Sequence, residues 1–274
     1  MDRHTPDLVP NPTLIVSVGE FGHQATRALQ RKLAHGRELW GAEVDRNAVT
    51  IQVLDEHQRS DIIASKWSPR FAPDGFLLDR VITFPADDQI DPWSAGKVST
   101  DWEGPTTSGS PADVLLDILT QVTERLFNIG QVVESGPAGS IRPPRYDILV
   151  VGDIADRATR GTHLQIRAHM AALVSGPFDL LFEPHHSNIA ITHLLAFHGM
   201  SLSRNRELAT ECQHLIAAYR GETEALGDVA TRLPSRFLFV EGRSLQYVAT
   251  REQLAETIGE YLMLMTVRRR RCPE

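Results

Sequence analysis

The stretch PTLIVSVGEFGHQATRALQRKL, residues 12–33, decides the fold expected for this chain. Thr13–Val18 is a continuous apolar and β-branched run, which is typical of strands covered on both faces. A glycine-containing turn, GEFG, follows at residues 19–22, and apolar residues then recur at positions 25, 29 and 33 with helical spacing. A buried strand, a glycine turn and a helix in this order predict the opening of a βαβ unit.

The rest of the chain alternates between strand and helix patterns. Further strands are predicted at residues 49–54, 81–84, 146–151, 188–197 and 237–240. Helices are predicted from Pro111, which follows a good N-cap at Ser110, and at residues 164–173, 208–219 and 254–265. Thr250 and Gln253 predict a capping box for the last helix. This alternation predicts an α/β fold with a mostly parallel, Rossmann-like sheet and helices on both faces, whose ligands bind beyond the carboxyl ends of the strands.

Length and segment composition predict one domain with short extensions. A chain of 274 residues with 42% hydrophobic composition can bury a full core. We expect a leader at residues 1–12, the domain at 13–267 and a basic tail at 268–274. A polar stretch rich in Asp, Gly, Ser, Thr and Pro predicts a long surface loop at about residues 86–110.

Charge and cysteine content narrow the function classes. The formal net charge of -7 argues against a general nucleic-acid surface, which would need a basic face. The chain has 2 cysteines, too few for a disulfide framework, and this fits a reducing compartment. No apolar signal-peptide core and no run long enough to span a membrane is present, so we expect a cytoplasmic protein.

The glycine turn at residues 19–22 has two interpretations. Unpaired backbone N–H groups and the helix dipole at a helix start can hold a phosphate without any basic side chain. Gly19 and Gly22 would let the backbone come close to that ligand. The alternative is a tight turn needed only for packing the helix on the sheet.

The same stretch resembles the first phosphate loop of the tubulin and FtsZ superfamily, particularly bacterial tubulin-like proteins. The resemblance rests on the G-x-x-G-x-Q spacing of Gly19, Gly22 and Gln24, and RFLFVEG at residues 236–242 is similar to the end of the family's nucleotide domain. It implies GTP or GDP as ligand and assembly with further copies or a protein partner. It also implies phosphate contacts from the whole turn, including Glu20 and Phe21, with Gln24 nearby.

The second phosphate loop departs from the family pattern. Where the superfamily has GGGTG(S/T)G, this chain reads GDIADRATRGT at residues 152–162. Asp153 and Asp156 would repel phosphate, whereas Arg157, Arg160 and Thr162 could contact it from a looser loop. The candidate ligand contacts of this segment are Gly152, Arg157, Thr159, Gly161 and Thr162.

Two further departures concern catalysis. The chain has no N-x-D-x-x-D acidic loop, and it ends where the family's second domain would begin. The resemblance therefore implies a degenerate relative that is not an active GTPase. Our leading hypothesis is a tubulin-like nucleotide-domain protein that acts through self-assembly or partner binding, with GTP binding weak or lost.

Two other functions stay open. Asp55, at the end of the second strand, lies where a dinucleotide-binding Rossmann fold has its ribose-binding acid, which would suit a nucleotide-dependent enzyme. The GxGxxG fingerprint is incomplete because position 17 is Ser, and Asp55 follows Gly22 by more than the usual ~20 residues. The third hypothesis is an interaction scaffold without a pocket, whose contact surfaces are the 86–110 loop and the run Arg268–Arg271.

A histidine cluster raises the question of a metal site. His185, His186, His193 and His198 lie close together in sequence, but their spacing matches no established zinc pattern. We interpret them as satisfied or solvated histidines. No G-x-S-x-G or HExxH motif is present, so nothing in the sequence indicates nucleophilic or metalloprotease chemistry.

Overall fold

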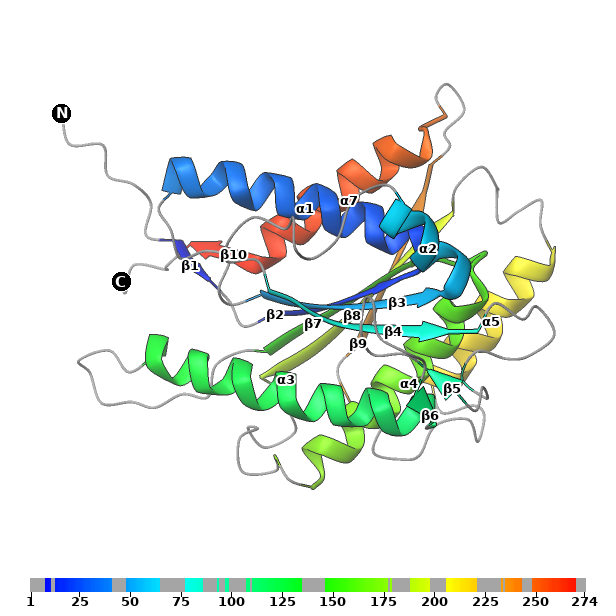
Figure 1. The fold of residues 1–274 in the computed structure, drawn as a ribbon, viewed down its shortest axis with the longest axis horizontal. Coiled ribbons are helices and arrows are strands. Elements are labelled where there is room, and N and C mark those ends of the chain that lie inside the picture. The colour runs from blue at the N-terminus through cyan, green and yellow to red at the C-terminus, as the bar shows by residue number, and fades with distance from the viewer. Residues whose placement is uncertain are drawn as a thin grey trace.

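A computed structural model gives the arrangement of most of the chain (Figure 1). The residues that the structure describes are 8–10, 13–40, 48–64, 77–85, 93, 97–98, 107–108, 110–134, 146–176, 178, 188–197, 206–220, 233, 235–242 and 248–269.

The centre of the molecule is a six-stranded sheet in the order β4-β3-β2-β7-β8-β9. Every pair of neighbours in this sheet is parallel. Its strands are β2 (Thr13–Val18), β3 (Ala48–Asp55), β4 (Leu77–Phe84), β7 (Tyr146–Asp153), β8 (Ile189–Phe197) and β9 (Ser235–Glu241). This is the strand order of a doubly wound, Rossmann-like α/β fold, and it confirms the fold class expected from the sequence.

Helices cover both faces of the sheet. They are α1 (Gly19–Trp40), α2 (Glu56–Ala64), α3 (Pro111–Glu134), α4 (Arg157–Val174), α5 (Arg206–Tyr219) and α7 (Arg251–Thr266). Helices α1 and α7 lie side by side on one face, and α3, α4 and α5 lie on the other (Figure 1). The central strands β2, β7 and β8 send alternate side chains into these two apolar layers, which explains why apolar residues predominate on both of their faces.

The predicted helix starts are confirmed where they were argued from capping residues. Helix α3 begins at Pro111, directly after Ser110. Thr250 and Gln253 form a reciprocal capping box before α7: the Gln253 backbone N–H donates to Thr250 Oγ1 at 3.2 Å, and the Thr250 backbone N–H donates to Gln253 Oε1 at 2.8 Å. Both side chains thereby satisfy amides that the helix leaves unpaired.

Four short strands and one helix were not anticipated. Strand β1 (Leu8–Pro10), from the expected leader, pairs antiparallel with β10 (Val267–Arg269), which extends into the basic tail. Within the expected loop at 86–110, β5 (Lys97–Val98) pairs with β6 (Thr107–Ser108). Helix α2 follows β3 directly. Among the helices that the structure describes, none is both long and apolar enough to cross a membrane.

Candidate functional site

The candidate site lies at the carboxyl ends of β2 and β7, the two central strands. The chain leaves β2 for α1 on one face and leaves β7 for α4 on the other. In doubly wound sheets the crevice between two such strands is the usual place for a ligand. Both glycine-containing segments singled out in the sequence, residues 19–22 and 152–162, meet here.

Gly19 adopts the left-handed conformation that glycine permits, with φ of 66°. A Cβ atom at this position would overlap the carboxylate of Asp156, which therefore lies directly over the first residue of α1. Asp156 is also the N-cap of α4, because its Oδ1 accepts a hydrogen bond from the Ala158 backbone N–H at 2.9 Å. The protein's own carboxylate thus lies against the turn at which the sequence predicts a phosphate.

The other Asp156 oxygen is held from α2. Gln58 Nε2 donates to Asp156 Oδ2 at 3.0 Å. Gln58 in turn forms a reciprocal cap with Asp55: the Gln58 backbone N–H donates to Asp55 Oδ1 at 2.7 Å, and the Asp55 backbone N–H donates to Gln58 Oε1 at 3.1 Å. Asp55 lies at the end of the second sheet strand, as predicted, but its carboxylate caps α2.

The electrostatics of this chain of contacts are unfavourable for a further anion. Burial raises the pKa of the Asp156 carboxyl above its ordinary value, and the nearby Asp55 adds to that increase. The hydrogen bonds from Gln58 and Ala158, and the charge of Arg251, act in the opposite direction. A phosphate entering here would bring more negative charge to a place where one carboxylate is already disfavoured.

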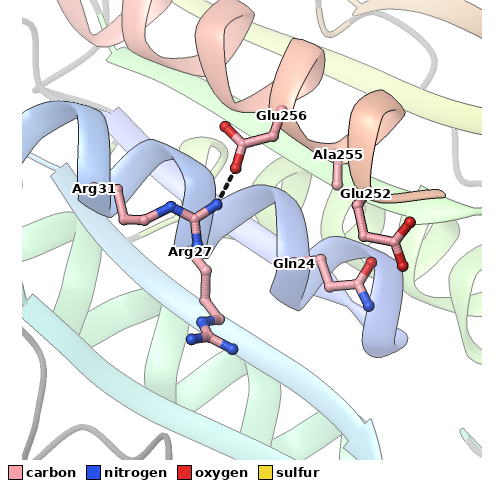
Figure 2. A pocket seen from close by; sticks show the side chains of 6 residues that line it. All are labelled: Gln24, Arg27, Arg31, Glu252, Ala255 and Glu256. Carbon is pink, nitrogen blue, oxygen red and sulfur yellow. Dashed lines mark hydrogen bonds and ion pairs between the residues drawn. The ribbon is translucent and has the colours of Figure 1, made fainter. Parts of the chain in front are cut away.

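Glu20 and Gln24 face α7 rather than the crevice. Arg251, the first residue of α7, donates from Nη1 to Glu20 Oε2 at 2.9 Å, and Gln24 Nε2 donates to Glu20 Oε1 at 3.0 Å. Gln24 lines a cleft of about 200 Å³ between α1 and α7. Figure 2 shows this cleft, in which Arg31 reaches Glu256 across the helix pair. Gln24 therefore lies in the cleft between α1 and α7, whereas the resemblance implied a position near a phosphate.

Phe21 and Gly22 serve packing. Phe21 is 1% exposed and lies in the apolar layer between the sheet and α7. A Cβ atom on Gly22 would come within 2.7 Å of the Val151 carbonyl oxygen and 3.0 Å of the Ser17 carbonyl carbon. The second glycine of the turn is therefore required for the close approach of α1 to β2 and β7, which is the packing interpretation left open in the sequence.

The residues of the second loop also turn inward. The Thr159 side chain is fully buried against Gly152, where a Cβ atom would overlap it. Thr162 is fully buried and donates from Oγ1 to the Ala158 carbonyl at 2.7 Å. Gly161 makes room for the indole ring of Trp93.

Trp93 and Arg157 complete the account of this loop. Trp93, from the expected surface loop, is 8% exposed and packs edge-on against Phe84 at 5.1 Å between ring centroids. Arg157 begins α4, and its side chain lies outside the described residues. Gly152, Thr159, Gly161 and Thr162 were predicted to contact a ligand, and in the structure they pack against neighbouring protein groups.

A buried histidine pair was missed in the sequence. His193 of β8 meets His163 of α4, with 2.6 Å between their Nδ1 atoms, and its ring stacks on Phe237 at 4.8 Å. Burial lowers the pKa of His163 to about 3 and lowers that of His193 well below its ordinary value. The other residues of the sequence cluster, His185, His186 and His198, lie outside the described residues. Within the part of the chain that the structure describes, no group of three or more His, Cys, Asp or Glu side chains could hold a metal ion.

Comparisons with protein-family models, with curated proteins and with solved structures found no match to this chain. At the crevice, the Asp156 carboxylate lies against Gly19 and is held by the Gln58 side chain and the Ala158 amide.

Proposed function

We propose that this chain is a tubulin-like nucleotide-domain protein that acts through self-assembly or partner binding, with its phosphate site closed by Asp156. One observation carries the proposal: the Asp156 carboxylate lies over Gly19, the first residue of the glycine turn. A carboxylate at a helix N-terminus satisfies the same dipole and amide groups as a phosphate oxygen. GTP or GDP would have to displace it.

Two hydrogen bonds hold the carboxylate in place, and two more fix the side chain and backbone of Gln58. The Ala158 amide and the Gln58 side chain each donate to one oxygen, and the Asp55 backbone and carboxylate fix Gln58. Displacing Asp156 would leave the α4 cap and the Gln58 amide without this partner, at a cost of about 1–3 kcal/mol for each buried group left unsatisfied. This cost supports weak or lost nucleotide binding.

The sequence supports the remaining parts of the proposal. It contains no N-x-D-x-x-D acidic loop, so the function does not depend on GTP hydrolysis. Its low cysteine content supports a reducing compartment such as the cytoplasm.

The binding half is tested by isothermal titration of GTP, GDP and ATP at millimolar concentration. We expect little or no heat with the natural chain, and tighter binding of GTP or GDP by about tenfold in Asp156→Gly, which removes the charge but leaves a permitted N-cap residue. Asp153→Asn is the matched control, because it changes the same charge in the same loop at an acid whose Oδ1 accepts a hydrogen bond from the Ala155 amide at 2.9 Å. Micromolar binding by the natural chain, or no gain in Asp156→Gly, would contradict a closed site.

The assembly half is tested by sedimentation and by electron microscopy of the purified chain with and without GTP. We expect particles larger than a monomer in both conditions, since assembly does not depend on the nucleotide in this proposal. If the purified chain is strictly monomeric and also captures no protein partner, the assembly half of the proposal is contradicted.

A further inference from the structure

Strand β9 is an open edge of the central sheet. It pairs with β8 on one side, and among the described residues no strand pairs with its other side. Along Ser235–Glu241, three side chains are exposed and the other four are half-buried, whereas every side chain of β8 is buried. An edge strand of this kind presents backbone N–H and C=O groups that can pair with another strand.

The edge is unusually apolar for an exposed strand. Phe239 is 40% exposed, and its ring stacks with Phe237 at 6.2 Å and lies 5.9 Å from Phe197. Val248, 58% exposed, lies beside the end of the strand, because the Ala249 backbone N–H donates to the Gly242 carbonyl at 2.7 Å. Exposed apolar groups gathered at one place mark interaction surfaces more often than scattered ones do.

The middle of β9 carries few of the devices by which proteins blunt an open edge, because its exposed charged residues, Arg236 and Glu241, lie near its two ends. Its sequence, SRFLFVE, contains no lysine and no proline. Its register with β8 runs from Ser235 to Glu241 without a bulge. Strands with such edges aggregate unless they are short, covered or paired. We therefore expect the open edge of β9 to pair with a strand of a specific partner.

We propose that β9 pairs antiparallel with β9 of a second copy of this chain, centred on Leu238, and joins the two six-stranded sheets into one. The inference rests on the assembly half of the proposed function and names its surface. Pairing of the same edge from two copies about a two-fold axis is necessarily antiparallel and closes the assembly at a dimer.

The strand is complementary to itself in this register. Phe237 of each copy lies opposite Phe239 of the other, on one face of the joined sheet. Such aromatic cross-strand pairs each stabilise a sheet by about 0.2–1 kcal/mol. In this register Arg236 of each copy lies opposite Val240 of the other, so the two Arg236 positions are about 13 Å apart along the strands. Parallel pairing would bring like charges together.

Sedimentation velocity over a micromolar concentration series tests the surface. We expect a dimer for the natural chain and a dissociation constant at least about tenfold higher for Phe239→Lys, which places a charge on the edge. Leu264→Lys is the matched control, because Leu264 is 72% exposed but lies on α7, and it should leave the dimer unchanged. The melting temperature of both variants checks that the fold survives.

A disulfide test reads the register directly. In a chain carrying Cys212→Ala and Cys272→Ser, Leu238→Cys should form an intermolecular disulfide, because opposite residues of an antiparallel pair lie about 4.5–5.5 Å apart at Cα. Arg236→Cys should not, because its two copies would be separated by about 13 Å along the strands.

The outcomes separate this inference from the proposed function. A monomer at every concentration, or a dimer that Phe239→Lys leaves intact, overturns pairing through β9. An assembly that persists in Phe239→Lys still agrees with the proposed function, whose nucleotide half is read separately from Asp156→Gly.

Discussion

Helix α4 carries ionisable groups in two contrasting settings. At its N-terminus, Asp156 accepts hydrogen bonds from Ala158 and Gln58 at the mouth of the crevice. Two turns further on, His163 meets His193 between α4 and the sheet, where burial and the nearby Arg167 act on His193. Burial raises the pKa of the carboxyl and lowers the pKa of both imidazoles. Both settings favour the neutral form of the side chain, so acid should act on them in opposite directions.

The contrast shows which polar groups a ligand could replace. The Asp156 carboxylate accepts from the Gln58 side-chain amide and the Ala158 backbone amide, and in the proposed function its removal opens the phosphate site. The histidine pair lies between a helix and the sheet and stacks on Phe237, so its loss leaves a defect in the core. We therefore expect changes at the start of α4 to affect ligand binding, and changes at His163 and His193 to affect stability.

The largest expected effect is acid unfolding through the histidines. Because the folded-state pKa of His163 is about 3 and that of His193 is also lowered, the unfolded chain binds protons first. Stability is full above pH ~6.5 and falls below it, by about 1.4 kcal/mol per pH unit for each histidine. Urea unfolding at pH 7, 6 and 5 measures this slope.

A double variant isolates the pair. His163→Leu with His193→Leu should reduce the slope by nearly two protons, whereas His23→Gln, at another buried histidine whose pKa is lowered to about 3, should reduce it by nearly one. An unchanged slope in the double variant would mean that the pair is accessible to protons in the folded state.

A smaller effect is expected at Gly22. Because its Cβ would press on the Val151 carbonyl and on Ser17, Gly22→Ala should cost about 3 kcal/mol of unfolding free energy, which urea unfolding measures.

Gly19→Ala tests the crevice side of the comparison. Its Cβ would overlap the Asp156 side chain, so part of its loss of unfolding free energy should vanish in Asp156→Gly. Urea unfolding of the two single variants and the double variant gives this coupling. Additive costs would show that Asp156 does not press on Gly19.

A still smaller effect, of less than about 1 kcal/mol, is expected for Asp156→Asn. Asparagine caps a helix about as well as aspartate and carries no charge. Since the folded-state pKa of Asp156 is raised, its ionised form lowers stability as pH rises through that pKa. The variant should therefore be slightly more stable than the natural chain at pH 7 and equal to it near pH 3. Lower stability at pH 7 would show that the charge itself strengthens the cap.

The smallest effect is expected for the ion pair between Glu20 and Arg251. Both side chains are substantially exposed, at 49% and 33%, so solvent screens their attraction. Arg251→Gln should change the unfolding free energy by no more than about 0.5 kcal/mol. A double-mutant cycle with Glu20→Gln measures the pair itself. A coupling of several kcal/mol would show that this rim is far less solvated than its exposure indicates.

Much of the fold was predictable because the faces that an element buries determine the spacing of its apolar residues. Thr13–Val18 and Tyr146–Val151 are apolar without alternation, and both are central strands covered on two faces. The Thr250 and Gln253 cap was predictable because both partners lie in one turn of chain. Local chemistry was sufficient in each of these cases.

The candidate site was predictable only in part. The position of Gly19 at a helix start was foreseen, and so was the repulsion that Asp156 would offer to a phosphate. The contact of Asp156 with Gln58, 98 residues away in sequence, had no local signal, and neither had the meeting of His163 with His193. The expectation that Gln24 lies near a phosphate came from spacing alone, whereas the packing of α1 on α7 turns this side chain away.

By itself the sequence determined the α/β class and the starts of the two helices with capping residues, α3 and α7, because these follow from apolar periodicity and from short-range capping. Only the tertiary structure decided which side chain lies against Gly19 and which strand is left at the edge. Strand order brings β2 beside β7 and leaves β9 outermost, and it is set by packing between segments far apart in the chain. Such contacts depend on how whole layers fit together, which no local stretch of residues records.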